Sequence, residues 1–406
     1  MSDPLARVLK GNLCAGCGAC AALAPGDVTM EVAPPGFLRP KAARALTVEE
    51  GRRFEAVCPG LGIDLDPAGR ASHPLWGPYE AVRTGWAADP DLRHVGSSGG
   101  ALSAALIHLL ESGAADAVIE TGAGDPAYAN RTVVSRTRDE VMAAAGSRYA
   151  ASAPLADLDA MLAAGERLVF VGKPCDVAAL RGLAKVDPRV DAQIVLMVSF
   201  FCGGVPAHQG AREVLAALGV AEAELAAFRY RGNGWPGFAT ATRRDGSAER
   251  MSYPDSWGKI LTQHVQARCK ICPDGTGGLA DLVCADAWEC DEKGYPIFEE
   301  REGRSLIVAR TKAGEAALTA AVEAGALTLE TGDEAVATAE EITLLQPGQR
   351  IRKGLVASRL AALRLMGRPA PRYRGFHLGE AARAMGVRDN LRNFLGMIRR
   401  IATGRV

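Results

Sequence analysis

Three cysteines near the N-terminus place the strongest constraint on how this sequence folds. The spacing C-x-x-C-x-x-C holds Cys14, Cys17 and Cys20 within a run that is rich in Gly and Ala. A fourth cysteine, Cys58, comes much later and directly precedes Pro59. This pattern is typical of the loop that wraps a cubic 4Fe-4S cluster in bacterial ferredoxins, where each thiolate binds a different iron. We therefore expect these four thiols to ligate one 4Fe-4S cluster, through which the chain would carry electrons.

The residue at position 24 limits the head of the chain to one cluster. In two-cluster ferredoxins a fourth cysteine follows the third after three intervening residues, precedes a proline, and ligates the other cluster. Here that position holds Ala24, before Pro25. The alternatives are a zinc site or a set of buried thiols, but zinc sites usually space their ligands as two C-x-x-C pairs. The spacing therefore favours a single iron–sulfur cluster.

Length and composition indicate a globular protein of two or three domains. The chain has 406 residues, of which 48% are hydrophobic, enough to bury a sizeable core. The first residues lack a secretion signal, and no apolar run approaches the roughly 20 residues that a membrane-spanning helix needs. We expect a cytoplasmic protein, whose ten cysteines are ligands more often than disulfide partners.

Charge is unevenly distributed along the chain, although the net charge is zero. Residues 350–406 hold 14 Lys and Arg against two acidic residues, a net charge of +12, so the remainder carries −12. Apolar residues recur among these arginines at helical spacing, which predicts a basic amphipathic helix. Such a helix suits an anionic membrane surface or an acidic protein, unless it packs on the acidic body of its own chain. Nucleic acid is disfavoured because aromatic residues are few.

Strand and helix patterns alternate through the middle of the chain and predict a layered α/β body of mixed α+β character. The predicted strands include 81–88, 117–121, 167–171, 193–201 and 305–311. The predicted helices include 101–112, 139–145, 155–164 and 257–267. These patterns divide the chain into a ferredoxin-like 4Fe-4S module, two regions of the α/β body and a basic helical tail, at residues 1–75, 76–165, 166–345 and 346–406.

A second group of cysteines lies in the body. Cys269 and Cys272 form a C-x-x-C pair, while Cys175 and Cys202 each follow a predicted strand. Loops at strand ends gather to form sites in α/β sheets, so these four thiols can meet. Four thiolates are the number that a second 4Fe-4S cluster requires. The spacing alone leaves zinc or free thiols as open as a cluster, because a C-x-x-C pair is common to several kinds of site.

Five motifs in one order carry a resemblance to a known family. They are the cysteine-bearing head, Gly96-Ser-Ser-Gly-Gly-Ala, Gly172-Lys-Pro-Cys, Phe201-Cys-Gly-Gly and Arg268-Cys-Lys-Ile-Cys-Pro-Asp. Over roughly residues 10–345 the chain resembles the beta subunits of coenzyme F420 hydrogenases and dehydrogenases, a family that includes ferredoxin-dependent reductases of chlorophyll metabolism. The resemblance implies FAD, bound by the region 76–165, and one or two 4Fe-4S clusters. It favours four ligands of a second cluster in the region 166–345, namely Cys175, Cys202, Cys269 and Cys272.

The Gly/Ser loop is the predicted flavin site. It opens the predicted helix 101–112, and a helix N-terminus offers unpaired N–H groups and a positive dipole to a phosphate. Ser97 and Ser98 can add hydroxyl donors, while Gly96, Gly99 and Gly100 allow close approach. An ordinary helix N-cap is the alternative. Together with the resemblance, the loop predicts binding of the FAD pyrophosphate.

A few further side chains are candidates for contacts in the same region. Lys173 is the expected cation near the flavin, where it would stabilise a reduced anionic ring, and a plain surface lysine is the alternative. Weaker candidates for contacts to ring or substrate are Arg148, Tyr149, Asn233, Trp235, Asp286 and Trp288. Cys284 alternates with apolar residues and is expected to be a buried structural thiol, whereas Cys290 has no predicted role. No side chain is singled out as catalytic.

The sequence thus predicts an iron–sulfur flavoprotein oxidoreductase that relays electrons through 4Fe-4S clusters to or from FAD and an organic substrate or coenzyme. Its partners would be ferredoxin or another redox carrier, a small molecule, and a second copy of the chain. One alternative is an electron-transfer subunit of a larger redox complex, without its own substrate site. The other is a zinc-stabilised binding module with no redox role.

Overall fold

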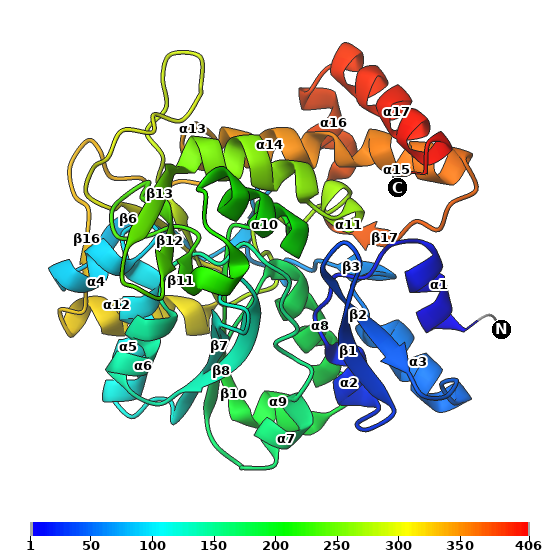
Figure 1. The fold of residues 1–406 in the computed structure, drawn as a ribbon, viewed down its shortest axis with the longest axis horizontal. Helices are drawn as coiled ribbons and strands as arrows, with labels where there is room; N and C mark the ends of the chain where they lie inside the picture. The colour runs from blue at the N-terminus through cyan, green and yellow to red at the C-terminus, as the bar shows by residue number, and fades with distance from the viewer. Residues whose placement is uncertain (1–2, 405–406) are drawn as a thin grey trace.

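An eight-stranded mixed sheet forms the centre of the protein in this computed structural model, which describes residues 3–404 (Figure 1). The strand order is β16-β6-β15-β14-β10-β9-β7-β8. The strands are β6 (Ala81–Ala87), β7 (Ala117–Ala123), β8 (Asn130–Ser135), β9 (Leu168–Val171), β10 (Ile194–Phe200), β14 (Leu282–Asp286), β15 (Ser305–Ala309) and β16 (Leu327–Leu329). The sheet and its helices confirm the predicted mixed α/β class, and five of these strands lie where the hydrophobic pattern predicts them.

Four central strands are parallel and set the position of the site. Strands β7, β9, β10 and β14 run in one direction, so the loops that follow them leave the sheet at a common edge. Strands β15, β6, β16 and β8 are each antiparallel to the neighbours that hold them in the sheet. Because of this arrangement, the start of β15 meets the end of β14, and Ser305 pairs with Asp286.

Helices cover both faces of the sheet because the buried strands are apolar on both sides. Val169 faces one core, which the helices α5, α6 and α12 close, while Phe170 faces the other core, which α7, α8 and α9 close. The helices of the first core are α5 (Ala101–Glu111), α6 (Arg138–Ala144) and α12 (Lys312–Glu323), and α4 (Pro90–Val95) precedes them. The helices of the second core are α7 (Leu158–Leu162), α8 (Pro174–Ala184) and α9 (Pro188–Gln193).

The N-terminal head packs beside α8. Its elements are α1 (Pro4–Lys10), α2 (Ala19–Leu23), β1 (Val28–Ala33), β2 (Phe37–Ala42), α3 (Val48–Val57) and β3 (Gly62–Asp64). Strands β1 and β2 form an antiparallel hairpin, and Thr47 and Glu50 form a capping box that starts α3. Helix α3 approaches α8 so closely that a Cβ on Gly182 would lie 2.8 Å from the Val57 backbone. A short hairpin of β4 (Ala71–His73) and β5 (Gly77–Tyr79) connects the head to the sheet.

A small antiparallel sheet and a distorted helix precede the C-x-x-C pair. The sheet contains β11 (Leu225–Arg229), β12 (Phe238–Arg243) and β13 (Ala248–Ser252), beside α10 (His208–Ala217) and a short turn of helix η1 (Glu222–Glu224). The prediction of a regular helix over 257–267 is wrong. A π-helical turn η2 (Pro254–Ile260) and a 3₁₀ turn η3 (Leu261–His264) occupy most of that range, and α11 (Ala267–Lys270) begins only afterwards. The Thr262 hydroxyl donates to the Gly258 carbonyl at 2.7 Å, a side-chain bond that competes with regular helix pairing.

The C-terminal segment returns to the head. It consists of α13 (Ile342–Leu345), α14 (Pro347–Gly354), α15 (Val356–Leu365), β17 (Arg372–Arg374), α16 (Leu378–Ala384) and α17 (Val387–Ala402). Strand β17 pairs in parallel with β3 of the head, and α17 packs along α15 (Figure 1). The tail is therefore helical as predicted, and it closes over the N-terminal module. Within residues 3–404, no helix combines the length and the apolar character required to cross a bilayer.

Candidate functional site

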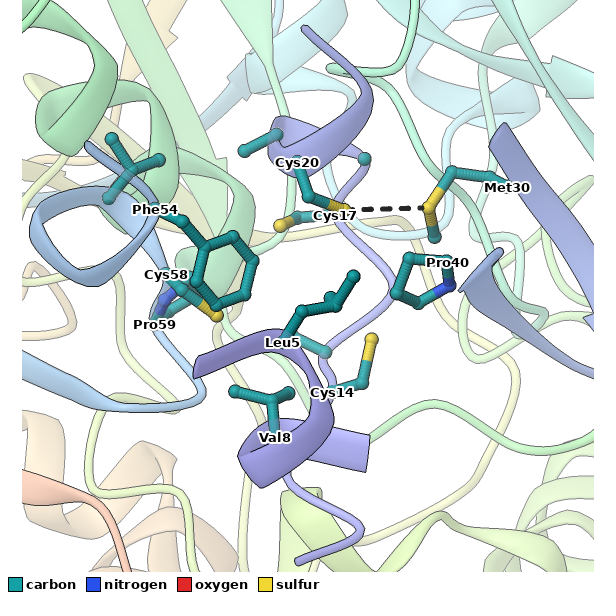
Figure 2. Close-up of a pocket in the computed structure, with 14 residues that line it drawn as sticks. Leu5, Val8, Cys14, Cys17, Cys20, Met30, Pro40, Phe54, Cys58 and Pro59 are labelled. Atoms are coloured by element: carbon teal, nitrogen blue, oxygen red, sulfur yellow. Dashed lines mark hydrogen bonds between the residues drawn. The ribbon is translucent and has the colours of Figure 1, made fainter. Parts of the chain in front are cut away.

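The four cysteines of the head line one cavity. Cys14 and Cys17 lie on the loop that enters α2, Cys20 lies in the first turn of α2, and Cys58 caps the end of α3. Apolar side chains of α1 and α3, among them Leu5, wall the same cavity, as Figure 2 shows. Gly16 and Gly18 adopt the left-handed conformation that this tight loop requires, with φ of 82° and 88°. The folded chain thus brings together the thiols that the spacing predicts to act as one set.

Burial makes these thiols poor thiolates unless a positive group joins them. It raises the pKa of Cys20 and of Cys58 to about 12, and it raises the pKa of Cys17 well above its usual value. Burial also raises the pKa of Cys14, against the opposing effects of Arg39 and other donors. A metal centre deprotonates the thiols that it binds, so an apolar cavity with four thiols fits a cationic iron–sulfur core.

The second set of cysteines gathers at the edge where the parallel strands end. Cys175 lies in the first turn of α8, after β9, and Cys202 follows β10. The Cys202 N–H donates to the Gly275 carbonyl at 2.8 Å, which joins this strand end to the loop that carries the C-x-x-C pair. Burial raises the pKa of Cys202 to about 12, and the neighbouring thiols of Cys269 and Cys272 contribute to that rise. The fold therefore brings these four thiols together, as the strand-end argument predicts.

Hydrogen bonds join the two cysteine sets across one interface. The buried Arg268 donates through Nη2 to the Pro59 carbonyl at 2.9 Å, next to Cys58. Gln266 donates to the Ala15 carbonyl at 3.4 Å and accepts a bond from Arg39 at 3.1 Å. The C-x-x-C loop is consequently a neighbour of the first cavity. The sequence indicates neither this proximity nor the role of Arg268.

The C-terminal helices cover the second set. Arg352 of α14 donates to the Cys202 carbonyl at 2.8 Å, and Gln349 donates to the same oxygen at 3.0 Å. Arg359 of α15 donates to the Lys270 carbonyl at 2.7 Å. Part of the basic charge of the tail therefore neutralises carbonyl dipoles around the second set and does not face a partner. The charge count reveals the basic tail, but not which arginines turn inward.

All ten cysteines are free thiols. Residues 3–404 contain no group of three or more His, Cys, Asp or Glu side chains that is arranged to hold a single metal ion. Cys284 is buried in the core beside Ile307, which confirms the structural thiol that its alternating pattern predicts. Cys290 is half-buried in an irregular segment, where it forms an isolated bridge with Pro296.

Lys173 is a buried cation between the two sets. Its ammonium lies 2.7 Å from the Asp176 carboxylate and donates to the Ser152 hydroxyl at 2.5 Å. Burial opposes its charge, but Asp176 and the thiol of Cys175 raise the pKa of Lys173 above its usual value. The interpretation of Lys173 as a plain surface lysine is therefore wrong. Its contact with flavin stays a prediction.

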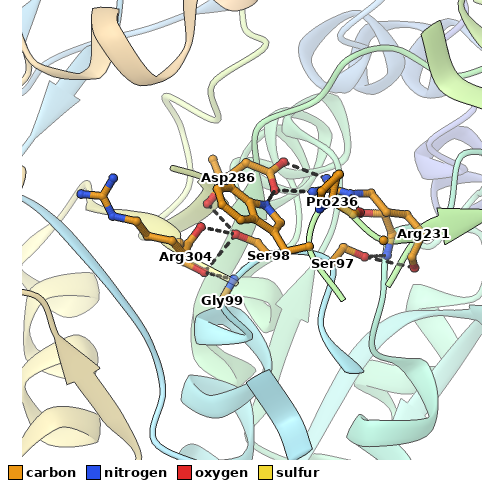
Figure 3. Close-up of polar contacts among 12 residues, drawn as sticks. Ser97, Ser98, Gly99, Arg231, Pro236, Asp286 and Arg304 are labelled. Atoms are coloured by element: carbon orange, nitrogen blue, oxygen red, sulfur yellow. Dashed lines mark hydrogen bonds and ion pairs between the residues drawn. The ribbon is translucent and has the colours of Figure 1, made fainter. Parts of the chain in front are cut away.

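Hydrogen bonds join the Gly/Ser loop to the start of β15, to the loop after β11 and to the loop after α6, as Figure 3 shows in part. The Ser98 hydroxyl lies 2.9 Å from the Arg304 carbonyl, and Ser305 accepts the Gly99 N–H at 2.9 Å. The Ser97 hydroxyl is within 3.3 Å of the Arg231 carbonyl and accepts the Ser147 N–H. These hydroxyls are engaged within the protein. The first N–H groups of α5 have no partner inside the helix and are what the loop offers a phosphate.

Glycine is required in this loop for space. A Cβ on Gly99 would lie 2.9 Å from the Gly85 carbonyl oxygen, and one on Gly96 would lie 2.9 Å from Gly100 Cα. Gly100 itself has φ of 71° and starts α5. The loop is thus held against β6 and β15 with no room for a side chain.

An ion pair inside an aromatic cluster lies beside the loop. Arg231, only 2% exposed, donates to both oxygens of Asp286 at 2.9 and 2.7 Å, and the Trp235 indole donates to the same carboxylate at 2.8 Å. The guanidinium lies over the rings of Tyr253 and Trp288, at 4.6 and 4.9 Å from their centroids. Three of the weak candidates therefore converge on Arg231, which the sequence analysis missed. An arginine within a Gly- and Trp-rich loop is the signal that could have identified it.

Two other weak candidates lie nearby and serve the fold. Arg148 donates to the Ala127 and Ala129 carbonyls, both at 2.8 Å. The ring of Tyr149 lies 4.5 Å from that of Trp257, measured between centroids. These contacts fix the loop after α6 against the connection between β7 and β8 and against η2.

The sheet places these groups in a definite order along one edge. Cys175 follows β9, Cys202 follows the adjacent β10, and Asp286 ends the next strand, β14. Ser305 starts β15 and pairs with Asp286 on one side and with Gly85 on the other. The second cysteine set, the Arg231–Asp286 pair and the Gly/Ser loop are thus successive neighbours.

Two family models match the chain. The model for the C terminus of the coenzyme F420 hydrogenase/dehydrogenase beta subunit matches residues 165–335, and the model for the N-terminal part of the same subunit matches residues 82–158. The chain belongs to the coenzyme F420 hydrogenase/dehydrogenase beta subunit family. Hydrogenases and dehydrogenases transfer electrons, so this is an oxidoreductase family, and the resemblance seen in the five motifs is confirmed.

Several members of the coenzyme F420 hydrogenase/dehydrogenase beta subunit family resemble the chain over much of its length. Coenzyme F420 hydrogenase subunit beta of Methanococcus voltae is 28% identical over 273 residues, which cover 64% of this chain and 87% of that protein. The coenzyme F420-dependent sulfite reductase of Methanocaldococcus jannaschii is 24% identical, in an alignment that covers 77% of this chain and 46% of that protein. The 7-hydroxymethyl chlorophyll a reductase of Oryza sativa is 28% identical over 45% of this chain and 38% of its own.

A solved structure supports the fold of the family. A chain of the F420-reducing [NiFe] hydrogenase complex from Methanosarcina barkeri aligns with a TM-score of 0.55 at 20% identity, over 72% of this chain and 96% of that chain. The two chains therefore share a fold over most of this chain.

Proposed function

We propose that the protein is an iron–sulfur flavoprotein oxidoreductase. Two 4Fe-4S clusters would be held by the head cysteines and by the strand-end set, and FAD would be held by the Gly/Ser loop. When bound, these groups supply one-electron transfer at the clusters and hydride or electron transfer at the flavin. The substrate would be a small organic molecule or coenzyme, and the electron donor a ferredoxin or another carrier.

The observation that carries this proposal is the junction of the two cysteine sets. Arg268 and Gln266 bond the C-x-x-C loop to the backbone of the first cavity, so two sets of four thiols are direct neighbours. Buried thiols with raised pKa values are poor nucleophiles and suit metal ligation better than thiol chemistry. Two adjacent ligand sets are an arrangement for passing electrons from one to the other.

The chain itself contributes exclusion of water and placement of charge. Apolar side chains such as Leu5 and Phe54 shield the first cavity, and α14 and α15 cover the second set. Lys173 and Asp176 place a buried ion pair between the sets. At the far end of the edge, the buried Arg231–Asp286 ion pair fixes the aromatic rings of Tyr253 and Trp288 beside the Gly/Ser loop.

Anaerobic purification tests the proposal directly. The protein is expected to contain about eight irons per chain if both sets hold clusters, and about four if only one does. Cys269→Ser should remove about half of the iron. Cys284→Ser, which changes a buried thiol outside both sets, should leave iron content unchanged. A colourless protein with bound zinc, or full iron in Cys269→Ser, would contradict the assignment.

FAD is tested separately by acid release and absorbance of the supernatant. Gly99→Ala places a methyl group against the Gly85 carbonyl and should reduce flavin content while leaving iron unchanged. Loss of iron without loss of flavin would place the cofactor elsewhere.

A second candidate function is an electron-transfer subunit of a larger complex. It is favoured because the Methanococcus voltae relative is named as a hydrogenase subunit and the structural neighbour belongs to a hydrogenase complex. The purified chain alone, given dithionite or reduced ferredoxin and a panel of acceptors, decides between the two. Turnover with a small-molecule acceptor supports the first function, and electron uptake without turnover supports the second.

The tail is the proposed contact to such a partner, in the cytoplasm. Helix α17 packs along α15 and buries Met397, but it leaves Val387, Leu391 and Leu395 exposed in a row at four-residue spacing. Arginines flank this row, which suits an acidic, partly apolar surface of a redox protein. Leu391→Glu should weaken such binding, measured by co-purification at low and high salt.

Two other measurements test other contacts of the tail. Flotation with anionic vesicles tests binding to a membrane surface, and gel filtration tests binding to a second copy of the chain.

A further inference from the structure

Arg268 is a deeply buried charge between the two cysteine sets. It precedes Cys269 in the first turn of α11, and only 2% of its surface is exposed. One of its nitrogens, Nη2, donates to the Pro59 carbonyl at 2.9 Å. The residue therefore lies next to a cysteine of the second set, and its side chain ends at the backbone beside a cysteine of the first.

The other two nitrogens of this guanidinium have no protein acceptor. Among residues 3–404, Nε and Nη1 of Arg268 are buried without a hydrogen-bond partner. The hydroxyl of Tyr373, whose ring lies 5.6 Å from the guanidinium carbon, is also buried and unpartnered. Folded proteins rarely leave buried N–H and O–H donors unpaired, so three orphan donors at one place indicate acceptors that the protein does not itself supply.

The thiols around these donors come from both sets. Arg268 directly precedes Cys269 of the second set. Its bond to the Pro59 carbonyl places the guanidinium beside Cys58, one of the four thiols that line the first cavity. A single cation thus lies next to members of both sets.

We propose that Arg268 is a positioning residue shared by the two clusters. Its free N–H groups donate to sulfur atoms, and its charge stabilises the reduced state of both clusters. This inference rests on the proposed function. Adding an electron to a cluster adds negative charge, and a buried cation favours that change more strongly than an exposed one. Charge and hydrogen bonds to sulfur are known determinants of cluster potentials.

The chain offers matched controls on either side. Arg39 is joined through Gln266 to the Ala15 carbonyl, next to Cys14 of the first set, and Arg352 donates to the Cys202 carbonyl of the second set at 2.8 Å. We therefore expect Arg39→Gln to lower the potential of the first cluster alone and Arg352→Gln that of the second alone. Arg268→Gln should lower both. A conservative Arg268→Lys, which keeps the charge, should restore both potentials most of the way.

The test is a redox titration of the anaerobic holoprotein, followed by EPR, with iron content measured for every variant. The expected effect of Arg268→Gln is at least a tenfold loss in the equilibrium constant for reduction at each cluster, about 59 mV for one electron. A shift at one cluster only, or at neither, with full iron retained, overturns the inference and leaves the proposed function intact. Wild-type protein without iron overturns the proposed function instead.

A second measurement needs no variant. One side chain that reaches both clusters places them close together, so the fully reduced wild-type protein should show an EPR spectrum broadened by interaction between two spins. Two independent, unsplit spectra in wild-type protein with full iron would overturn the shared role of Arg268 even if Arg268→Gln does not fold.

Discussion

Glu120 should make the stability of this protein depend on pH. The carboxyl is 6% exposed on β7, and the Ser135 hydroxyl donates to it at 2.6 Å. Burial raises the pKa of Glu120 from its usual 4.5 to about 7, while the bond from Ser135 partly opposes the shift. Because the folded protein favours the neutral acid, the folded state is not penalised below pH 4.5, and it loses stability as the pH rises through 7.

The size of the effect follows from the shift. A change of about 2.5 units corresponds to about 3 kcal/mol of unfolding free energy, of which about 2 kcal/mol is lost between about pH 5.5 and pH 8. Glu120→Gln keeps the shape and removes the ionisation. The unfolding free energy of Glu120→Gln relative to that of wild type should therefore grow by about 2 kcal/mol as the pH rises across that interval. Urea unfolding of both proteins in the same cofactor state measures this difference.

A surface substitution provides the comparison for this experiment. Glu323→Gln removes an exposed carboxyl from α12 and should follow the wild-type pH dependence. The reasoning about Glu120 is refuted if the difference between Glu120→Gln and wild type is the same at both ends of that interval.

Two further substitutions test the region around the Gly/Ser loop, and a third, at an exposed ion pair, is their control. Asp286→Asn leaves the buried Arg231 cation without its carboxylate and should cost about 3–5 kcal/mol, measured as a lower midpoint of thermal or urea unfolding. Ser305→Ala removes the acceptor of the Gly99 N–H and should cost about 1–3 kcal/mol by the same measurement. Arg167→Ala breaks an exposed ion pair and should leave the midpoint unchanged; a loss as large as that of Asp286→Asn would contradict the argument from burial.

The predictable part of the site consists of residues whose spacing reflects a local requirement. The spacing of Cys14, Cys17 and Cys20 indicates one loop, and the Gly/Ser loop indicates a helix start. Cys175 and Cys202 could be grouped because parallel strands end at a common edge. Each of these arguments needs only short-range geometry or one rule of sheet topology.

The unpredicted part depends on contacts between segments far apart in the sequence. Arg268 bonds to a carbonyl 209 positions away, and Arg231 pairs with an acid 55 positions away. Neither the length of the loops between such partners nor their composition indicates which cation turns inward. The regular helix expected over 257–267 was wrong for a local reason, since side-chain bonds such as that of Thr262 compete with the helix pattern.

The pairing of β17 with β3 sets the order of events during synthesis. Domains generally fold from the N-terminus as the chain leaves the ribosome, but here the head is completed by residues 372–374, which are made long after residues 62–64. Until then the helices that cover the Cys202 carbonyl are absent, and the thiols of the second set lack that cover. Under the proposed function, the late return of the C-terminal chain leaves an interval in which iron and sulfide can reach the second set before α14 and α15 cover it.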